Sequence, residues 1–325
     1  FIVNEKKEGA SGITTHLHLI NLLKEVYPDC NIYNLDIVEN CQDGKATYIN
    51  CDVRKPIDLK DVVITVDDII FNFAAVHRTP GHPDHAYFET NILGAENVTA
   101  FAEKHGIRKI VFTSSIAPYG AAEDLKKETT LPTPNTPYGI SKLVAEKIHT
   151  IWQAKSQQER QLTIVRPGVV FGKRENGNFT RLYWGIRGHK FMYPGRKDTV
   201  KACIYVKELV RFMLYRLEHH EEGVELYNCT FEPAYTIEQI VETMKKVTGM
   251  KRSVPLIPAW VLMSAASVIG CLGAPMGICP ARVKKLMVST NICGKKLAAS
   301  GYIFHYTFEE AISDWFKDND NQYLK

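Results

Sequence analysis

The stretch Thr113-Ser114-Ser115-Ile116-Ala117-Pro118-Tyr119-Gly120 and the later stretch Tyr138-Gly139-Ile140-Ser141-Lys142 decide how this chain is interpreted. The first follows the apolar run 110–112, which is typical of a buried parallel strand. The second stands where a helical pattern begins after Pro137 and continues to about Trp152. The sequence therefore predicts hydroxyl groups at the end of a strand, and a tyrosine and a lysine near the start of a helix.

Three of these side chains have complementary chemistry. Tyr138 and Lys142 are four positions apart, so they share one helix face, one turn from each other. An ammonium group beside a phenol favours the phenolate, and we expect Lys142 to lower the pKa of Tyr138. Ser115 would hydrogen-bond the same substrate oxygen, which completes a proton relay beside a flat cofactor. A Tyr-x-x-x-Lys pair alone also occurs on solvated helix faces, and the preceding serine segment is what makes the pattern specific.

At these residues the chain resembles the extended short-chain dehydrogenase/reductase family, in its nucleotide-sugar epimerase branch. The resemblance implies a Rossmann-type doubly wound parallel sheet with a smaller C-terminal substrate domain. We expect the NAD-binding Rossmann domain in residues 1–172 and mainly the substrate domain in residues 173–325, with some segments returning to the Rossmann core. The resemblance further implies catalytic roles for Tyr138, Lys142 and Ser115, with Ser114 against the nicotinamide. A homodimer is usual in this family.

Composition agrees with an α/β enzyme of one large domain or two joined ones. The chain has 325 residues, 45% of them hydrophobic, and a net charge of +4, which is too mild to indicate nucleic-acid binding. Its eight cysteines include no Cys-x-x-Cys pair and mostly stand in apolar runs, which favours reduced thiols and a cytoplasmic location. The first 20 residues are charged and interrupted, so we expect no signal peptide.

The start of the chain has the strand, glycine-rich turn and helix that cradle a pyrophosphate. An apolar run at residues 1–3 precedes Gly9 and Gly12, and a helical pattern follows to about Val26. The two glycines would let a dinucleotide approach the backbone. The motif is irregular, because Thr15 takes the place of the usual third glycine and the charged residues 5–8 interrupt the strand. The register of this strand stays open.

Asp36 closes a second predicted strand, residues 31–36. An acidic side chain there accepts hydrogen bonds from both ribose hydroxyls of an adenosine and repels a 2′-phosphate, which favours NAD over NADP. A loop or N-cap aspartate is the alternative. A third strand, residues 47–51, leads to Asp52 and Val53, the pair that touches adenine in the resembled family.

A fourth strand, residues 69–75, ends in Ala74 and Ala75, which are small enough for a dinucleotide to lie close. A helix is expected from Asp84 to His105. Alternating strands and helices indicate a parallel, doubly wound sheet, in which ligands bind beyond the carboxyl ends of the strands. His77 follows the alanines and is expected beside the substrate. The spacing of His77, His82 and His85 matches no common zinc pattern, so we expect no metal.

The second half of the chain carries the candidate substrate contacts. Many relatives have an asparagine three residues after Arg166 that holds the substrate diphosphate, and this chain has Val169 there. Asn178 opens a predicted helix rich in basic and aromatic residues and is expected to contact the substrate. Arg196 and Lys201 would meet a diphosphate; a solvated basic loop is the alternative.

Residues 253–281 carry no charge and are flanked by basic residues. A spanning helix needs ~20 mostly apolar residues, but prolines and glycines interrupt this stretch. It is either a buried helix of the substrate domain or an apolar face resting on a membrane, with the basic flanks against anionic lipid. The second alternative would place the protein at the inner face of the membrane.

Four stretches are similar to those of bacterial 4-epimerases that act on polyprenyl-diphosphate-linked N-acetylglucosamine: residues 74–78, 113–120, 171–178 and 281–285. This resemblance would account for both Val169 and the uncharged stretch. Ile116 and Ala117 stand where related dehydratases and decarboxylases have acidic residues, and neither side chain can move a proton. We therefore expect an NAD-dependent sugar 4-epimerase working through a 4-keto intermediate on a nucleotide- or lipid-linked sugar diphosphate. An NAD-dependent dehydrogenase of an apolar alcohol and a non-catalytic dinucleotide-binding regulator are the alternatives.

Overall fold

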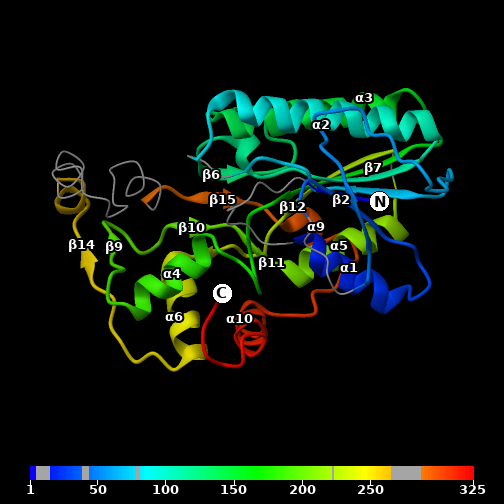
Figure 1. Ribbon diagram of the computed structural model, residues 1–325. Helices are drawn as coiled ribbons and strands as arrows, with labels where there is room; N and C mark the ends of the chain where they lie inside the picture. Colours follow the sequence, from blue (N-terminus) through cyan, green and yellow to red (C-terminus); the bar gives the residue numbers. More distant parts are fainter. Residues whose placement is uncertain (5–14, 39–43, 78–80, 222, 265–286) are drawn as a thin grey trace.

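A seven-stranded parallel sheet forms the centre of the protein (Figure 1). The computed structural model describes residues 1–4, 15–38, 44–77, 81–221, 223–264 and 287–325. The strand order is β12-β7-β5-β4-β1-β2-β3, and each neighbouring pair is parallel. The strands are β1 (Ile2–Val3), β2 (Tyr33–Asp36), β3 (Thr47–Asn50), β4 (Ile69–Asn72), β5 (Lys109–Thr113), β7 (Gln161–Pro167) and β12 (Val224–Cys229). This architecture confirms the predicted Rossmann-type doubly wound sheet.

Helices cover both faces of this sheet. On one face α2 (Asp84–His105) and α3 (Pro137–Ala154) lie side by side, and on the other α1 (Thr15–Val26) packs against α5 (Val206–Glu218) (Figure 1). The strands are apolar on both sides because they are buried on both sides. Within β5, Phe112 belongs to the core under α2 and α3, whereas Val111 belongs to the core under α1 and α5.

The strand order reverses between β1 and β4, and this is where ligands bind in doubly wound sheets. All carboxyl ends of the parallel strands lie along the same edge. Asp36 ends β2, Ala74 and Ala75 follow β4, and Ser114 follows β5. The sheet therefore aligns these residues along one edge, as the sequence predicts.

Smaller elements build a second region beside this edge, around a core that contains Phe171 and Trp315. A four-stranded sheet has the order β13-β10-β15-β6, and two short pairs, β11-β8 and β14-β9, flank it. The strands are β6 (Ala122–Lys126), β8 (Val169–Phe171), β9 (Tyr193–Pro194), β10 (Val200–Lys201), β11 (Cys203–Tyr205), β13 (Tyr235–Thr236), β14 (Leu256–Ile257) and β15 (Thr290–Ile292). The helices are η1 (Ala117–Tyr119), α4 (Asn178–Arg187), α6 (Ile237–Thr248), α9 (Lys295–Ala298) and α10 (Phe308–Lys317).

One difference from the sequence prediction has a physical reason. The fourth strand ends at Asn72 and does not continue to Ala75, because the Asn72 side-chain oxygen accepts a hydrogen bond from the Ala74 amide at 3.0 Å and turns the backbone away. The strand β12 and the helix α5, both from the second half of the sequence, belong to the large sheet and its cover. The boundary at residue 172 stays a prediction.

Within the described ranges, no helix is long and apolar enough to cross a membrane. Residues 253–264 of the uncharged stretch are described, and residues 265–281 lie outside the described residues. The cysteines in the described part of the chain, Cys30, Cys51, Cys203, Cys229 and Cys293, are free thiols.

Candidate active site

The end of β5 and the first turns of α3 bring the three predicted catalytic side chains together. Ser115 lies close enough to the Tyr138 phenol for its hydroxyl to lower the pKa of that phenol. Lys142, one turn further along α3, is 1% exposed, and its Nζ lies 4.5 Å from the centroid of the Phe112 ring on β5. A phenol and a hydroxyl therefore lie together at the carboxyl edge of the sheet, with the amine one helix turn away.

The sequence around Tyr138 explains how α3 reaches this position. The Thr136 side chain caps the helix by accepting a hydrogen bond from the Gly139 amide at 3.1 Å. A Cβ atom on Gly139 would lie 2.6 Å from the carbonyl oxygen of Ala117 in η1. Only glycine permits this close approach, which sets the separation between Tyr138 and the segment that carries Ser115.

Burial controls the protonation of the pair and corrects one expectation. Burial raises the pKa of Tyr138 to about 12, and the neighbouring Tyr87 adds to this shift, while the hydrogen bond from Ser115 opposes it. Burial also lowers the pKa of Lys142 to about 7, which the Glu146 carboxylate offsets only in part. The expectation that Lys142 lowers the pKa of Tyr138 is wrong for these groups as arranged, because an amine close to neutrality exerts little charge on the phenol.

Buried polar side chains hold α3 against its neighbours, and the sequence analysis did not assign them roles. On α2, Asn91 donates to the Ser141 hydroxyl at 2.8 Å and accepts from the Val76 amide at 2.8 Å. On α3, Glu146 forms an ion pair with Arg166 of β7 at 2.6 Å. The sequence signal was present: Glu146 stands four residues after Lys142, on the same helix face.

The cofactor contacts predicted on β2 and β3 are engaged with protein groups. The Asp36 carboxylate is fully buried and accepts hydrogen bonds from Asn4 Nδ2 at 2.8 Å and from the Val38 amide at 3.3 Å. Asp52 forms a two-pronged pair with Arg54, at 2.8 and 2.7 Å, and this hydrogen bonding lowers the pKa of Asp52. The predicted roles of Asp36 and Asp52 in cofactor binding stay predictions.

The remaining cofactor residues differ in accessibility. Ala74 is buried and Ala75 is half-buried after β4, and Ser114 is buried after β5. Val53 is fully buried, and a Cβ atom on Gly94 of α2 would come within 3.0 Å of it. Gly9 and Gly12, predicted to approach the pyrophosphate, lie outside the described residues.

Of the predicted substrate residues, His77 follows β4 of the large sheet, and Asn178, Arg196 and Lys201 are spread over the second region. His77 is exposed, and Asn178 is exposed at the start of α4, where its side-chain oxygen accepts from Arg181 at 3.0 Å. The Arg196 guanidinium pairs with Asp198 at 2.7 Å and with Glu123 of β6 at 3.3 Å. Lys201 donates to the Val288 carbonyl oxygen at 2.7 Å. A substrate phosphate would have to compete with these partners, and the four assignments stay predictions.

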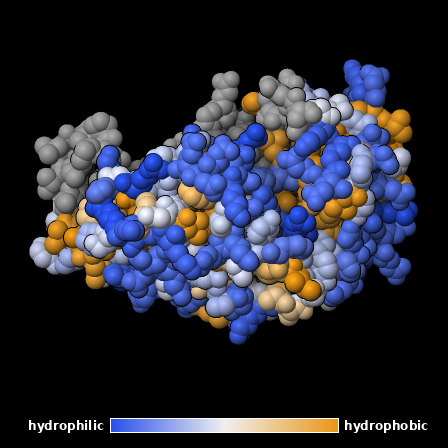
Figure 2. All heavy atoms as spheres, turned by 90° about the horizontal axis from the view of Figure 1, so that it is seen from below, coloured by the Kyte–Doolittle hydropathy of each residue, from blue (hydrophilic) through white to orange (hydrophobic). Residues whose placement is uncertain are grey.

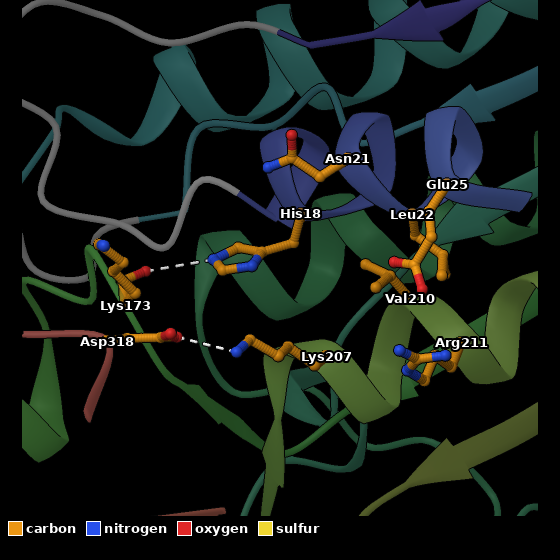
Figure 3. Close-up of a pocket in the computed structure, with 9 residues that line it drawn as sticks. All are labelled: His18, Asn21, Leu22, Glu25, Lys173, Lys207, Val210, Arg211 and Asp318. Atoms are coloured by element: carbon orange, nitrogen blue, oxygen red, sulfur yellow. Dashed lines mark hydrogen bonds and ion pairs between the residues drawn. The ribbon is translucent and has the colours of Figure 1, made fainter. Parts of the chain in front are cut away.

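A pocket of about 290 Å³ lies in the groove between α1 and α5 (Figure 3). Lys207 at its edge is paired with Asp314 at 2.6 Å and with Asp318 at 2.9 Å. Its lining residues, His18, Asn21, Leu22, Glu25, Lys173, Lys207, Val210, Arg211 and Asp318, are different from every predicted site residue. We therefore keep this pocket separate from the candidate active site. Among the described residues, which include His77, His82 and His85, no cluster of His, Cys, Asp or Glu side chains is arranged to hold a metal ion.

Comparison with known sequences identifies the family. Residues 10–230 match the NAD dependent epimerase/dehydratase family. The chain belongs to this family. It is also 33% identical over 313 residues to the N-acetyl-alpha-D-glucosaminyl-diphospho-ditrans,octacis-undecaprenol 4-epimerase of Escherichia coli O157:H7, covering 94% of this chain and 91% of that protein. The predicted resemblance to sugar epimerases is confirmed.

Solved structures of epimerases share the fold of this family member. The UDP-N-acetylglucosamine 4-epimerase from Methanobrevibacter ruminantium M1, in complex with UDP-N-acetylmuramic acid, matches with a TM-score of 0.73 at 18% identity, over 99% of this chain and 98% of that one. MoeE5, in complex with UDP-glucose and NAD, matches with a TM-score of 0.71 at 19% identity, over 98% of both chains. At these identities the likeness shows the fold alone.

The surroundings of the Lys142 amine are compatible with binding of NAD, the cofactor of this family. It is almost completely buried. Within the described residues its Nζ lies over the Phe112 ring, the charges of Glu146 and His149 interact with it, and no group accepts a hydrogen bond from it. A buried amine without an acceptor is costly unless a ligand supplies one. Ribose hydroxyls are suitable acceptors.

Replacing Lys142 by Met should stabilise the fold and abolish turnover. In the native protein the pKa of Lys142 is about 7, which is lower than in the unfolded chain, so the unfolded chain binds this proton more tightly. The buried charge therefore lowers the free energy of unfolding by its full amount below pH 7 and by less as the pH rises above 7. We expect Lys142→Met to raise the free energy of unfolding by about 2 kcal/mol at pH 6 and by less at pH 9. Urea unfolding at the two pH values measures this, with the exposed Lys104→Met as control. An equal stability change at both pH values would contradict the assignment.

Proposed function

We propose that the protein is an NAD-dependent sugar 4-epimerase that works through a transient 4-keto sugar. The observation that carries this proposal is the Tyr138 phenol beside the Ser115 hydroxyl, one helix turn from the buried amine of Lys142. Membership of the NAD dependent epimerase/dehydratase family and the similarity to the E. coli 4-epimerase over nearly the whole chain support it.

Each protein group has a defined task. Tyr138 accepts the proton of the sugar C4 hydroxyl as the C4–H bond breaks, and it returns the proton after the 4-keto sugar has presented its other face. Ser115 hydrogen-bonds the same oxygen. Lys142 binds the nicotinamide ribose. Bound NAD supplies the reversible hydride acceptor, and the positive charge of its oxidised nicotinamide favours an anionic phenol nearby.

The neighbouring side chains restrict the chemistry to this exchange. Ile116 and Ala117 lie between Ser115 and the rest of η1 and carry no acid or base. Elimination or decarboxylation at the neighbouring carbons would need a further proton donor. Hydride transfer with one acid/base is what the described groups at this point can perform.

We infer that the substrate is an N-acetylhexosamine linked through a diphosphate to a polyprenyl chain or a nucleotide. The E. coli relative acts, by its name, on a diphospho-undecaprenol sugar. In this chain Val169, an apolar residue at the start of β8, occupies the position where many nucleotide-sugar enzymes have an asparagine. This replacement favours the lipid carrier.

A substrate comparison tests the proposed function. Purified protein is incubated with polyprenyl-diphospho-N-acetylglucosamine and, separately, with UDP-N-acetylglucosamine, and the C4 configuration of the product is read by NMR. We expect C4 inversion without net NADH, and about 10²–10⁴-fold slower conversion by Tyr138→Phe. Steady NADH accumulation would indicate the one-way dehydrogenase instead. No conversion together with no NAD binding in calorimetry would favour a non-catalytic regulator.

We also propose that the described part of the uncharged stretch rests on an anionic membrane surface. Trp260 is 73% exposed, and Leu256 on β14 and Met192 beside β9 are exposed near it, since β14 and β9 pair. Figure 2 shows apolar side chains gathered at the end of the molecule that carries these strands in Figure 1. The flanking cations Lys190 and Lys251 are exposed. Apolar side chains with basic neighbours are typical of interfacial binding.

Vesicle flotation tests this membrane contact. We expect the protein to float with phosphatidylglycerol-containing vesicles, and the double variant Leu256→Ala/Trp260→Ala to bind about tenfold more weakly, because it loses apolar area at the interface. Leu131→Ala, another exposed apolar position, serves as the matched control. Equal flotation of the double variant and the control would exclude this surface.

The outer face of α2 and α3 is proposed as a homodimer interface. Ile140, Val144 and Ile151 recur at helical spacing on α3, and Leu93 lies on α2; all four are exposed although they are apolar. Since the two helices lie side by side, these residues can pack against the same residues of a second copy related by two-fold symmetry.

Sedimentation analysis tests the interface. We expect a dimer, and a shift to monomer in the double variant Leu93→Glu/Ile151→Glu, because charges in an apolar interface are costly. The matched control is Val63→Glu/Leu131→Glu, which places the same charges at exposed positions outside these helices. Should the first variant remain dimeric, the contact lies elsewhere.

A further inference from the structure

A buried carboxylate connects the two halves of the candidate active site. Glu146 lies on α3, one turn after Lys142, and is almost completely buried. One of its oxygens accepts a hydrogen bond from the hydroxyl of Ser114, the neighbour of Ser115. The helix turn that bears the amine is thus bonded to the strand end that bears the hydroxyl.

Arg166 fixes this carboxylate from a third element. Its guanidinium donates from Nε to Oε1 at 2.8 Å and from Nη2 to Oε2 at 2.6 Å, a two-pronged pair that defines the orientation of both groups. Arg166 lies on β7, the sheet neighbour of β5. The carboxylate of Glu146 therefore joins α3 to the ends of two adjacent strands.

The contact continues to the edge of the sheet. The Arg166 guanidinium lies over the Tyr119 ring, 4.7 Å from its centroid, and the Tyr119 hydroxyl donates to Asn228 of β12 at 2.9 Å. Tyr119 belongs to η1, the turn that Gly139 approaches. The connected side chains of Glu146, Arg166 and Tyr119 thus contact both segments that position the active site: the helix that carries Tyr138 and the turn that follows Ser115.

Stability alone is a weak reason for such an arrangement. Two buried charges gain little over well-packed apolar side chains, because both must be removed from water. Their two-pronged geometry does confer a fixed position. An active site needs its groups held within about 0.5 Å of productive geometry.

We propose that Glu146, held by Arg166, is a positioning residue that fixes Tyr138 and Lys142 on α3 against Ser115. This role rests on the proposed epimerase function. Glu146 also favours the charged form of Lys142, and because Arg166 already balances its charge, the amine stays only partly compensated. The carboxylate thus acts on both the placement and the protonation of the site.

The charged and titratable groups around this turn are few. Glu146, His149 and Tyr138 lie on α3, Arg166 lies on β7 beyond Glu146, and Tyr87 of α2 lies against Tyr138. Burial lowers the pKa of His149 to about 4, so this ring is neutral in the working range. Glu146 is therefore the group whose charge most directly supports the Lys142 ammonium.

A second buried pair supplies a matched control for the experiment. Arg216 of α5 and Glu225 of β12 form the same two-pronged contact, with N–O distances of 2.5 and 3.1 Å, and both side chains are buried. None of the predicted catalytic residues belongs to α5 or β12. Glu225→Gln therefore removes a comparable buried ion pair that contacts none of the predicted catalytic residues.

The experiment compares Glu146→Gln with Glu225→Gln. We expect both to lower the unfolding temperature, but only Glu146→Gln to lower kcat, by about 10–100-fold with KM for the sugar nearly unchanged, because acid–base geometry is lost. The alkaline fall of kcat should also move to lower pH in Glu146→Gln, since Lys142 loses the carboxylate that holds its proton. Equal kcat and pH profiles of the two variants would overturn the proposal.

Two further measurements keep the outcome decisive. Arg166→Lys keeps a positive charge beside Glu146 but loses the two-pronged contact, so it should lower kcat severalfold without moving the pH profile; it replaces Glu146→Gln if that variant does not fold. NAD affinity by calorimetry should weaken in Glu146→Gln and stay unchanged in Glu225→Gln. If the wild-type protein converts no sugar, the proposed function fails, and NAD affinity still tests the positioning role.

Discussion

The burial of one amine is the constraint on which the rest of the site depends. Lys142 of α3 is buried against the Phe112 ring of β5, where its charge is disfavoured. Burial acts on Tyr138 in the opposite sense and keeps its phenol protonated. Burial therefore disfavours the charged form of both groups, and the proposed reaction needs the phenolate of Tyr138. A positively charged ligand beside Tyr138 would favour its phenolate.

The parallel sheet permits this burial because its polar side chains lie at one edge, where the strands end, while its two faces are apolar. Ser114 and Arg166 end or follow adjacent strands, and Glu146 reaches both from the helix above. Buried polar groups are tolerated only when paired. The carboxyl edge is the place where a Rossmann-type sheet can collect several of them without disrupting its core.

The sequence predicted what depends on local pattern. The boundaries of α2 agree because Pro83 precedes it and Gly106, with φ of 68°, ends it, and the apolar runs of β4, β5 and β7 are those of strands buried on both faces. The strand β12 was missed, because Glu225 interrupts its apolar pattern and finds its partner, Arg216, on another element. The predicted direction of the shift in the pKa of Tyr138 was wrong, because the spacing of Tyr138 and Lys142 in the sequence does not indicate that α2 buries the phenol. Arg196 was expected to be open to a phosphate, whereas Glu123 on β6, far away in sequence, pairs with it.

Two buried arginine–glutamate pairs of similar geometry show that the role of an ion pair depends on its place in the fold. The Arg216–Glu225 pair joins α5 to β12, where its effect is confined to holding a helix on a sheet. The Arg166–Glu146 pair has the same chemistry, but it lies one turn of helix from Lys142, and its serine partner, Ser114, is the residue next to Ser115. A small displacement of the side chains would have little effect at the Arg216–Glu225 pair. At the Arg166–Glu146 pair, the same displacement would change the distance between the Tyr138 phenol and the substrate oxygen whose proton it accepts. The requirement for a fixed geometry, more than any gain in stability, accounts for a charged pair at the catalytic edge of the sheet.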